Sequence, residues 1–119
     1  MPTIATFNVN SILARLPNLL EWLKDADPDI VCLQELKCTD DAFPRLELLA
    51  AGYQALVHGQ KTYNGVAILA KTEPKLIRAG LPGDPDDTQA RYLEAEIGDL
   101  RVASIYLPNG CLLYTSIVK

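Results

Sequence analysis

The stretch that decides the fold is Asp29-Ile30-Val31-Cys32-Leu33-Gln34-Glu35-Leu36-Lys37. Its apolar run follows Pro28, which ends any preceding helix and favours extended structure beside it. A short apolar run with β-branched residues is typical of a strand buried on both faces. In open α/β sheets ligands bind beyond the carboxyl ends of strands. We therefore expect Glu35 to lie where a metal or substrate binds, the alternative being a solvated residue at a strand end.

A second strand candidate covers residues 3–10 and ends in Asn8 and Asn10. If the two strands are parallel neighbours, Asn8 and Glu35 reach the same edge of the sheet. A carboxylate and an amide oxygen suit a hard cation such as Mg²⁺, or Mn²⁺ in its place, because such a cation keeps several waters and needs few protein ligands. We predict a weak cation site at this edge.

The composition fits one folded domain, with 119 residues of which 49% are hydrophobic. The formal net charge of −4 has the wrong sign for a general nucleic-acid binder. A DNA-binding role would therefore need clustered basic residues or a metal that offsets the acidic site. The three cysteines lack zinc-finger spacing, and the sequence shows neither a signal-peptide pattern nor an apolar run of membrane-spanning length. We expect a reduced, cytoplasmic protein.

Hydrophobic spacing predicts a helix over residues 17–25 that begins at Pro17, with an irregular turn before it. Trp22 should pack against the sheet or cap its rim. A second, short helix is expected at residues 43–50. Further strands are expected at residues 53–57, 65–70, 75–78, 92–97 and 100–107. This order predicts an α/β fold with one mixed sheet and helices on one face.

Five segments occur in an order and spacing that resemble the exonuclease III family of abasic-site endonucleases, within the endonuclease/exonuclease/phosphatase superfamily. They lie at residues 6–11, 29–37, 63–69, 90–93 and 105–110. The resemblance covers about residues 2–110 and implies the N-terminal half of a four-layer, two-sheet sandwich. On this view the chain supplies about one sheet, whose inner face would be exposed.

The resemblance also implies an activity, the hydrolysis of phosphodiesters at abasic sites and at 3′ ends of duplex DNA, with Mg²⁺ as cofactor. Glu35 would be the main carboxylate ligand. Asn8 would either bind the cation or orient water bound to it. Tyr106 corresponds to a tyrosine that contacts the scissile phosphate. Glu35, Asn8 and Tyr106 thus form the expected catalytic set.

Basic and supporting residues complete the expected site. Arg91 corresponds to an arginine that meets the DNA backbone, and a guanidinium suits phosphate because it is a planar fork of donors. Lys37 and Lys61 are further phosphate-binding candidates. Gln34 and Asn64 are expected to support the site from behind the direct ligands.

The tail departs from the family pattern. We expect a division into residues 1–110, the N-terminal half of the family domain, and residues 111–119, a segment that does not continue the family's sequence. The family's Asp-x-Asn motif, its later catalytic aspartate and its C-terminal Asp-His pair all correspond to positions beyond residue 110. We therefore expect a fragment that is inactive alone. Full-length members of the family are expected to be monomeric. Two alternatives stay open: another phosphodiesterase or phosphatase of the superfamily, or a non-catalytic DNA- or protein-binding module.

Overall fold

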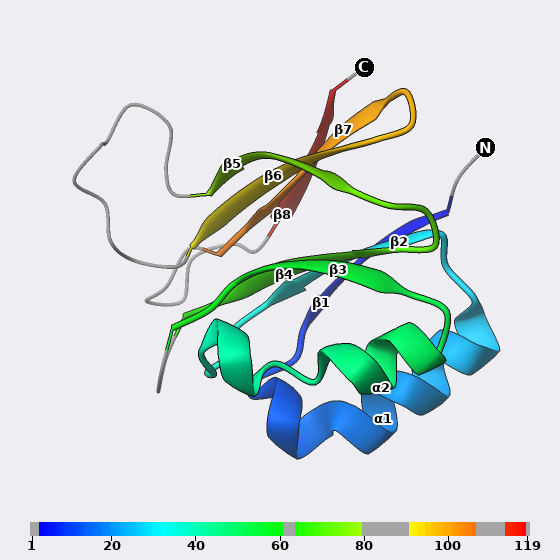
Figure 1. Cartoon of the computed structure of the whole chain (residues 1–119), viewed down its shortest axis with the longest axis vertical. Helices are drawn as coiled ribbons and strands as arrows, with labels where there is room; N and C mark the ends of the chain where they lie inside the picture. Colours follow the sequence, from blue (N-terminus) through cyan, green and yellow to red (C-terminus); the bar gives the residue numbers. More distant parts are fainter. Residues whose placement is uncertain (1–2, 61–63, 80–90, 107–113, 119) are drawn as a thin grey trace.

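The computed structural model describes residues 3–60, 64–79, 91–106 and 114–118, the last segment by its backbone alone. Figure 1 shows three layers. Helices cover one face of a first sheet, and a second sheet lies against its other face. The predicted α/β class, with a mixed sheet that carries helices on one face, is confirmed for the first sheet.

The first sheet has the strand order β1-β2-β4-β3. β1 (Ile4–Asn8) pairs in parallel with β2 (Ile30–Gln34), as the sequence predicts. β2 and β3 (Gln54–His58) each pair antiparallel with β4 (Val66–Ala70). Every residue of β2 and β4 is buried, because these central strands are covered on both faces.

The second sheet has the order β5-β6-β7-β8 and is antiparallel throughout. Its strands are β5 (Lys75–Ala79), β6 (Tyr92–Ile97), β7 (Leu100–Ile105) and β8 (Tyr114–Val118). β6 alternates between buried and half-buried residues, the pattern of a strand with one face on a core. β8 lies in the tail and pairs with β7 from Ile105↔Tyr114 to Arg101↔Val118. The division at residue 110, followed by a tail that does not continue the family's sequence, stays a prediction.

The expectation of a single sheet with an exposed inner face is wrong, because the second sheet covers that face. An alternating strand shows that one of its faces is buried, but not what covers it. The sequence-based prediction places the strands after β4 in the first sheet, whereas in the structure the chain crosses over and forms a second sheet. The apolar residues buried between the sheets are Ile30, Cys32, Val66, Ile68, Ala70, Leu93, Ala95, Ile97 and Val102.

The first helix differs from its prediction at its start. α1 spans Ile12–Ala26 and contains Pro17, so a start at Pro17 is wrong. The Ser11 hydroxyl caps the helix by accepting from the Ala14 amide at 3.4 Å. Ile12 is fully buried, and its amide donates to the Leu36 carbonyl at 3.0 Å. This anchoring holds the first turn in place. Pro17 has no N–H to donate to the carbonyl four residues before it. Because Pro17 is exposed, that carbonyl is open to water.

Two shorter elements complete the helical layer: a 3₁₀ turn, η1 (Asp40–Ala42), and α2 (Arg45–Ala50). Trp22 packs edge-on against Phe7 with ring centroids 5.7 Å apart, which confirms its predicted contact with the sheet. In the described part of the chain, no helix combines the length and apolar character that crossing a membrane requires.

Candidate metal and phosphate site

The carboxyl ends of β1 and β2 meet at one edge of the first sheet. Asn8, the last residue of β1, lies in parallel register with Gln34, the last residue of β2. The Val9 amide donates to the Gln34 carbonyl at 3.0 Å, which extends the pairing past Asn8. Glu35 follows directly. The predicted arrival of Asn8 and Glu35 at the same edge is therefore seen in the structure.

Tyr106, which follows β7 on the second sheet, also reaches this edge. Its hydroxyl donates a hydrogen bond to Glu35 Oε1 at 2.6 Å. This bond to the carboxylate, followed by partial burial, raises the pKa of Tyr106 to about 12. Tyr106 is therefore a hydrogen-bond donor near neutral pH. Its backbone is held by the residue that precedes β6, because the Tyr106 amide donates to the Arg91 carbonyl at 2.8 Å.

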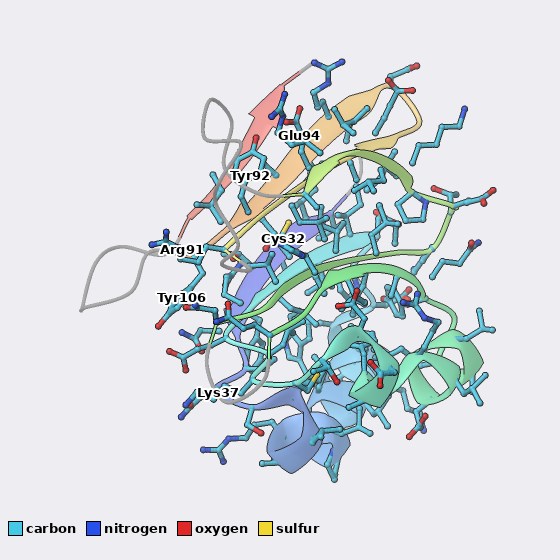
Figure 2. The ribbon with its side chains drawn as sticks, turned by 60° about the vertical axis from the view of Figure 1, so that its left-hand side comes forward. Cys32, Lys37, Arg91, Tyr92, Glu94 and Tyr106 are labelled. Carbon is cyan, nitrogen blue, oxygen red and sulfur yellow. The ribbon has the colours of Figure 1, made fainter. Side chains whose placement is uncertain are left out.

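Lys37 forms an ion pair with Glu35. Its ammonium lies 3.7 Å from Glu35 Oε2 and donates to Asn10 Oδ1 at 2.7 Å. Figure 2 shows Lys37, Tyr106 and Arg91 along the same side of the molecule. Asn10 was not predicted as a site residue, although its spacing of two from Asn8 beyond a strand end is a signal that sequence reasoning had available.

The backbone around the site adopts an uncommon conformation. Glu35 and Lys37 have positive φ angles of 59° and 56°, and Asn64 has one of 61°. Left-handed backbone at a residue other than glycine costs about 1 kcal/mol or more and is concentrated at functional sites. Asn10 and Ser11 at the end of β1 also have positive φ. Five such residues thus gather at this edge, and two of them, Asn10 and Asn64, are of a type that adopts this conformation readily.

Neighbouring segments hold this backbone through hydrogen bonds. The Leu36 amide donates to the Gly65 carbonyl at 3.1 Å, and the Lys37 amide donates to the Asn64 carbonyl at 3.0 Å. The Glu35 carbonyl accepts from the Ser11 amide at 2.9 Å. The backbone of residues 35–37 is therefore held from two sides, by residue 11 on one and by residues 64 and 65 on the other.

Gln34 lies behind Glu35 and is fully buried. Its Nε2 atom lies 2.9 Å from Thr6 Oγ1 on β1 and 3.2 Å from Ser104 Oγ on β7. The Ser104 hydroxyl donates to the Leu33 carbonyl at 3.0 Å. Sequence reasoning missed Ser104, because a single serine in an apolar strand carries no signal of what lies opposite it.

Three predicted site residues remain: Asn64, Arg91 and Lys61. The side chain of Asn64 donates to Gln60 Oε1 at 3.1 Å, so its contact with the Glu35 segment runs through its carbonyl. Arg91 is half-buried beside Tyr106. Lys61 falls outside the described residues. Their roles toward DNA stay predictions.

The donor set fits a hard cation in part. Among the described residues, no group of three or more His, Cys, Asp or Glu side chains is gathered as a metal site. Glu35 offers one carboxylate, and Asn8 offers an amide oxygen that accepts from the Asn10 amide at 3.0 Å. Carboxylate and amide oxygens suit Mg²⁺, with water completing the shell. The edge presents hydroxyl and ammonium donors beside the carboxylate, and the weak cation site stays a prediction.

The fold of two packed sheets, with polar strand ends at one shared edge, can now be compared with known families. The family model described as the Endonuclease/Exonuclease/phosphatase family matches residues 5–114, which is most of the chain. The chain belongs to this family.

Individual relatives show which members of the family the chain resembles. The chain is 43% identical over 109 residues to exodeoxyribonuclease III of Haemophilus influenzae, a match that covers 88% of this chain and 41% of that protein. It superposes with a TM-score of 0.85 on an AP endonuclease from Archaeoglobus fulgidus, at 42% identity, covering 91% of this chain and 42% of the other. It also resembles the 3′ phosphatase NExo from Neisseria, solved with a product DNA hairpin, with a TM-score of 0.86, 44% identity, and coverage of 89% and 41%. The chain thus spans about two fifths of the length of these relatives.

Proposed function

We propose that this chain forms the metal- and phosphate-binding part of a Mg²⁺-dependent DNA repair nuclease of the exonuclease III type. The observation that carries the proposal is the 2.6 Å hydrogen bond from the Tyr106 hydroxyl to Glu35, with the Lys37 ammonium 3.7 Å from the same carboxylate. Hydrolysis of a phosphodiester needs a carboxylate that holds the cation and donors that bind phosphoryl oxygens. Glu35 suits the first need, and Tyr106 and Lys37 suit the second.

Each residue has a distinct role in this proposal. Glu35 holds Mg²⁺, and Asn8 assists either as a ligand or by orienting bound water. The cation, when bound, polarises a phosphoryl oxygen and offsets its charge. Tyr106 keeps its proton at neutral pH, because its pKa is about 12, and so can donate to a phosphate oxygen. Arg91 contacts the DNA backbone through its planar guanidinium.

We further propose that the 119 residues alone do not cleave DNA. They span 41% of the length of the Haemophilus relative. By the family resemblance, the general base and a histidine of the phosphate-binding set lie in the remaining length. Removal of one transition-state donor commonly lowers the rate by about 10² to 10³. Loss of several groups should bring incision below detection.

The test uses the purified chain, Glu35→Gln, and a duplex with one abasic site. We expect Mg²⁺- or Mn²⁺-dependent binding of the duplex that is weakened in Glu35→Gln, and no incision by either. Incision by the parent but not by the variant would show that the nuclease assignment is right and the proposed inactivity wrong. Absence of both metal binding and duplex binding would overturn the proposal.

A phosphatase is the second candidate, because the Neisseria structure is of a 3′ phosphatase with product DNA. A matched duplex that ends in a 3′ phosphate separates the two. Tighter metal-dependent binding of this duplex than of the abasic one would favour the phosphatase. Duplex binding that is insensitive to Glu35→Gln would instead indicate a non-catalytic binding module.

A further inference from the structure

A hydroxyl is buried between the sheets where the sequence offers apolar neighbours. Ser104 is fully buried, as is Val102 on the same strand. Burial of a hydroxyl costs free energy unless it is hydrogen-bonded. Both hydrogen bonds of Ser104 cross to the first sheet: it donates to the Leu33 carbonyl at 3.0 Å and accepts from Gln34 Nε2 at 3.2 Å. Ser104 therefore joins the two sheets by directional contacts.

The amide of Gln34 extends this connection to a third strand. Besides Ser104, its Nε2 atom approaches Thr6 Oγ1 at 2.9 Å and the Cys32 carbonyl at 3.2 Å. Thr6 lies on β1, two residues before Asn8. One buried side chain thus contacts the three strands that lead to Asn8, Glu35 and Tyr106.

The position of Ser104 relates it to the site. Successive residues of a strand point to opposite faces, so Ser104 and Tyr106, two residues apart, are expected on the same face. Opposite them, Gln34 directly precedes Glu35 on the chain. The Ser104–Gln34 contact and the Tyr106–Glu35 hydrogen bond are therefore neighbouring links between the same two segments.

We infer that Ser104 is a positioning residue, whose hydroxyl and the Gln34 amide together set the separation of the two sheets at which the Tyr106 hydroxyl meets Glu35. Apolar packing alone is non-directional and does not specify this separation. The inference rests on the proposed function for its consequence in metal binding. Its geometric content, the Tyr106–Glu35 hydrogen bond, can be measured without metal.

The metal-free test records the Tyr106 ¹³Cζ signal by NMR at pH 7 in the full chain labelled with [¹³Cζ]tyrosine, with Tyr106→Phe to assign the signal. Glu35→Ala gives the position of the signal when the Tyr106 hydroxyl has lost its acceptor. In Ser104→Ala, the signal should move most of the way to its position in Glu35→Ala. Ser104→Thr keeps the hydroxyl and should keep the parental signal.

Val102→Ala is the matched control, because it removes buried methyl groups from the same strand and core without touching the hydroxyl network. It should lower the melting temperature at least as much as Ser104→Ala and leave the Tyr106 signal at its parental position. A parental Tyr106 signal in Ser104→Ala would overturn the inference. So would an equal displacement of the signal in Val102→Ala, because the hydroxyl would then not be the cause.

Mn²⁺ affinity, measured by paramagnetic broadening, is the second readout. Loss of a group behind a metal ligand commonly weakens binding by about 10- to 100-fold, and we expect about 10-fold for Ser104→Ala with no change for Val102→Ala. If no variant binds Mn²⁺, including the parent, the proposed metal site fails. The position of the Tyr106 signal would still decide the inference, so the two failures are distinguishable.

Discussion

The two ends of the first sheet carry the same kinds of side chain, but connect them differently. At the end away from the site, the Lys71 ammonium lies 2.6 Å from Asp27 and 3.9 Å from Asp29. Asp29 also accepts from the Thr3 amide at 2.7 Å. The hydroxyl of Tyr53 donates to a backbone carbonyl, that of Pro28, at 2.5 Å. The carboxylates here bind groups that tie strand and helix ends together.

At the site end, the tyrosine donates to the carboxylate itself. Burial is the main cause that raises the pKa of Tyr53, whereas the hydrogen bond to Glu35 is the main cause for Tyr106. The strained backbone also differs: Asp27 adopts positive φ where its amide ends α1, a common cap, while Glu35 and Lys37 adopt it beyond a strand. The same residue types thus tie backbone ends together at one end, and at the other end the tyrosine and the lysine contact the carboxylate.

The largest expected effect tests whether the site end depends on its backbone. Gly65 has a φ of 94°, and a Cβ there would lie 2.8 Å from the Leu36 Cβ atom. Gly65→Ala should lower the free energy of unfolding by about 3 kcal/mol, because it adds strain and a clash. Chemical denaturation measures this loss. Gly98→Ala is the control: its φ is 59° with no atom within 4 Å, so it should cost about 1 kcal/mol, and equal losses would contradict the account.

The next effect separates the two tyrosines. Tyr53→Phe removes a buried hydrogen bond and should lower the free energy of unfolding by about 1–2 kcal/mol. Mn²⁺ affinity should not change, because Tyr53 lies at the other end of the sheet. Tyr106→Phe should show the reverse, a smaller loss of stability with altered Mn²⁺ binding. Denaturation and Mn²⁺ titration of both variants decide whether the ends are independent.

A smaller effect concerns the two lysines. Lys37→Met removes a positive charge that lies 3.7 Å from Glu35, so it should tighten Mn²⁺ binding by about threefold, a modest change because the ion pair is partly exposed. Lys71→Met should leave Mn²⁺ affinity unchanged. If Lys37→Met weakened binding instead, Lys37 would act by ordering Asn10 and Glu35 rather than by competing with the cation.

The effect that is smallest near neutral pH appears only in alkali. The pKa of Tyr106 is about 12 in the folded chain against an ordinary 10, so the folded state binds its proton more tightly. Its contribution to stability is complete below pH 10 and is lost as the pH rises toward 12. Tyr106→Phe should make the fall in stability over this range shallower, as followed by denaturant midpoints. A fall as steep as that of the parent would mean that the Tyr106–Glu35 bond is absent in solution.

Much of the site could be predicted from local sequence. A short apolar run after Pro28 is nearly obliged to be a buried strand, and the polar residues that end it must then lie at a sheet edge. The parallel pairing that brings Asn8 beside Gln34 follows from two such strands joined by a helix. The helix start at Ile12 was missed, because it depends on carbonyls of residues 35 and 36, which are distant in sequence.

The sequence by itself determined the strands, their polar ends and the family resemblance, because periodicity and strand-end chemistry are local properties of the chain. The tertiary structure alone decided that two sheets form rather than one, since alternation shows that a face is buried without showing its partner. It alone decided that Ser104 reaches Gln34, and that Tyr106 reaches Glu35 across 71 positions of sequence. Contacts between layers depend on how two faces meet in space, and no short stretch of residues encodes that distance.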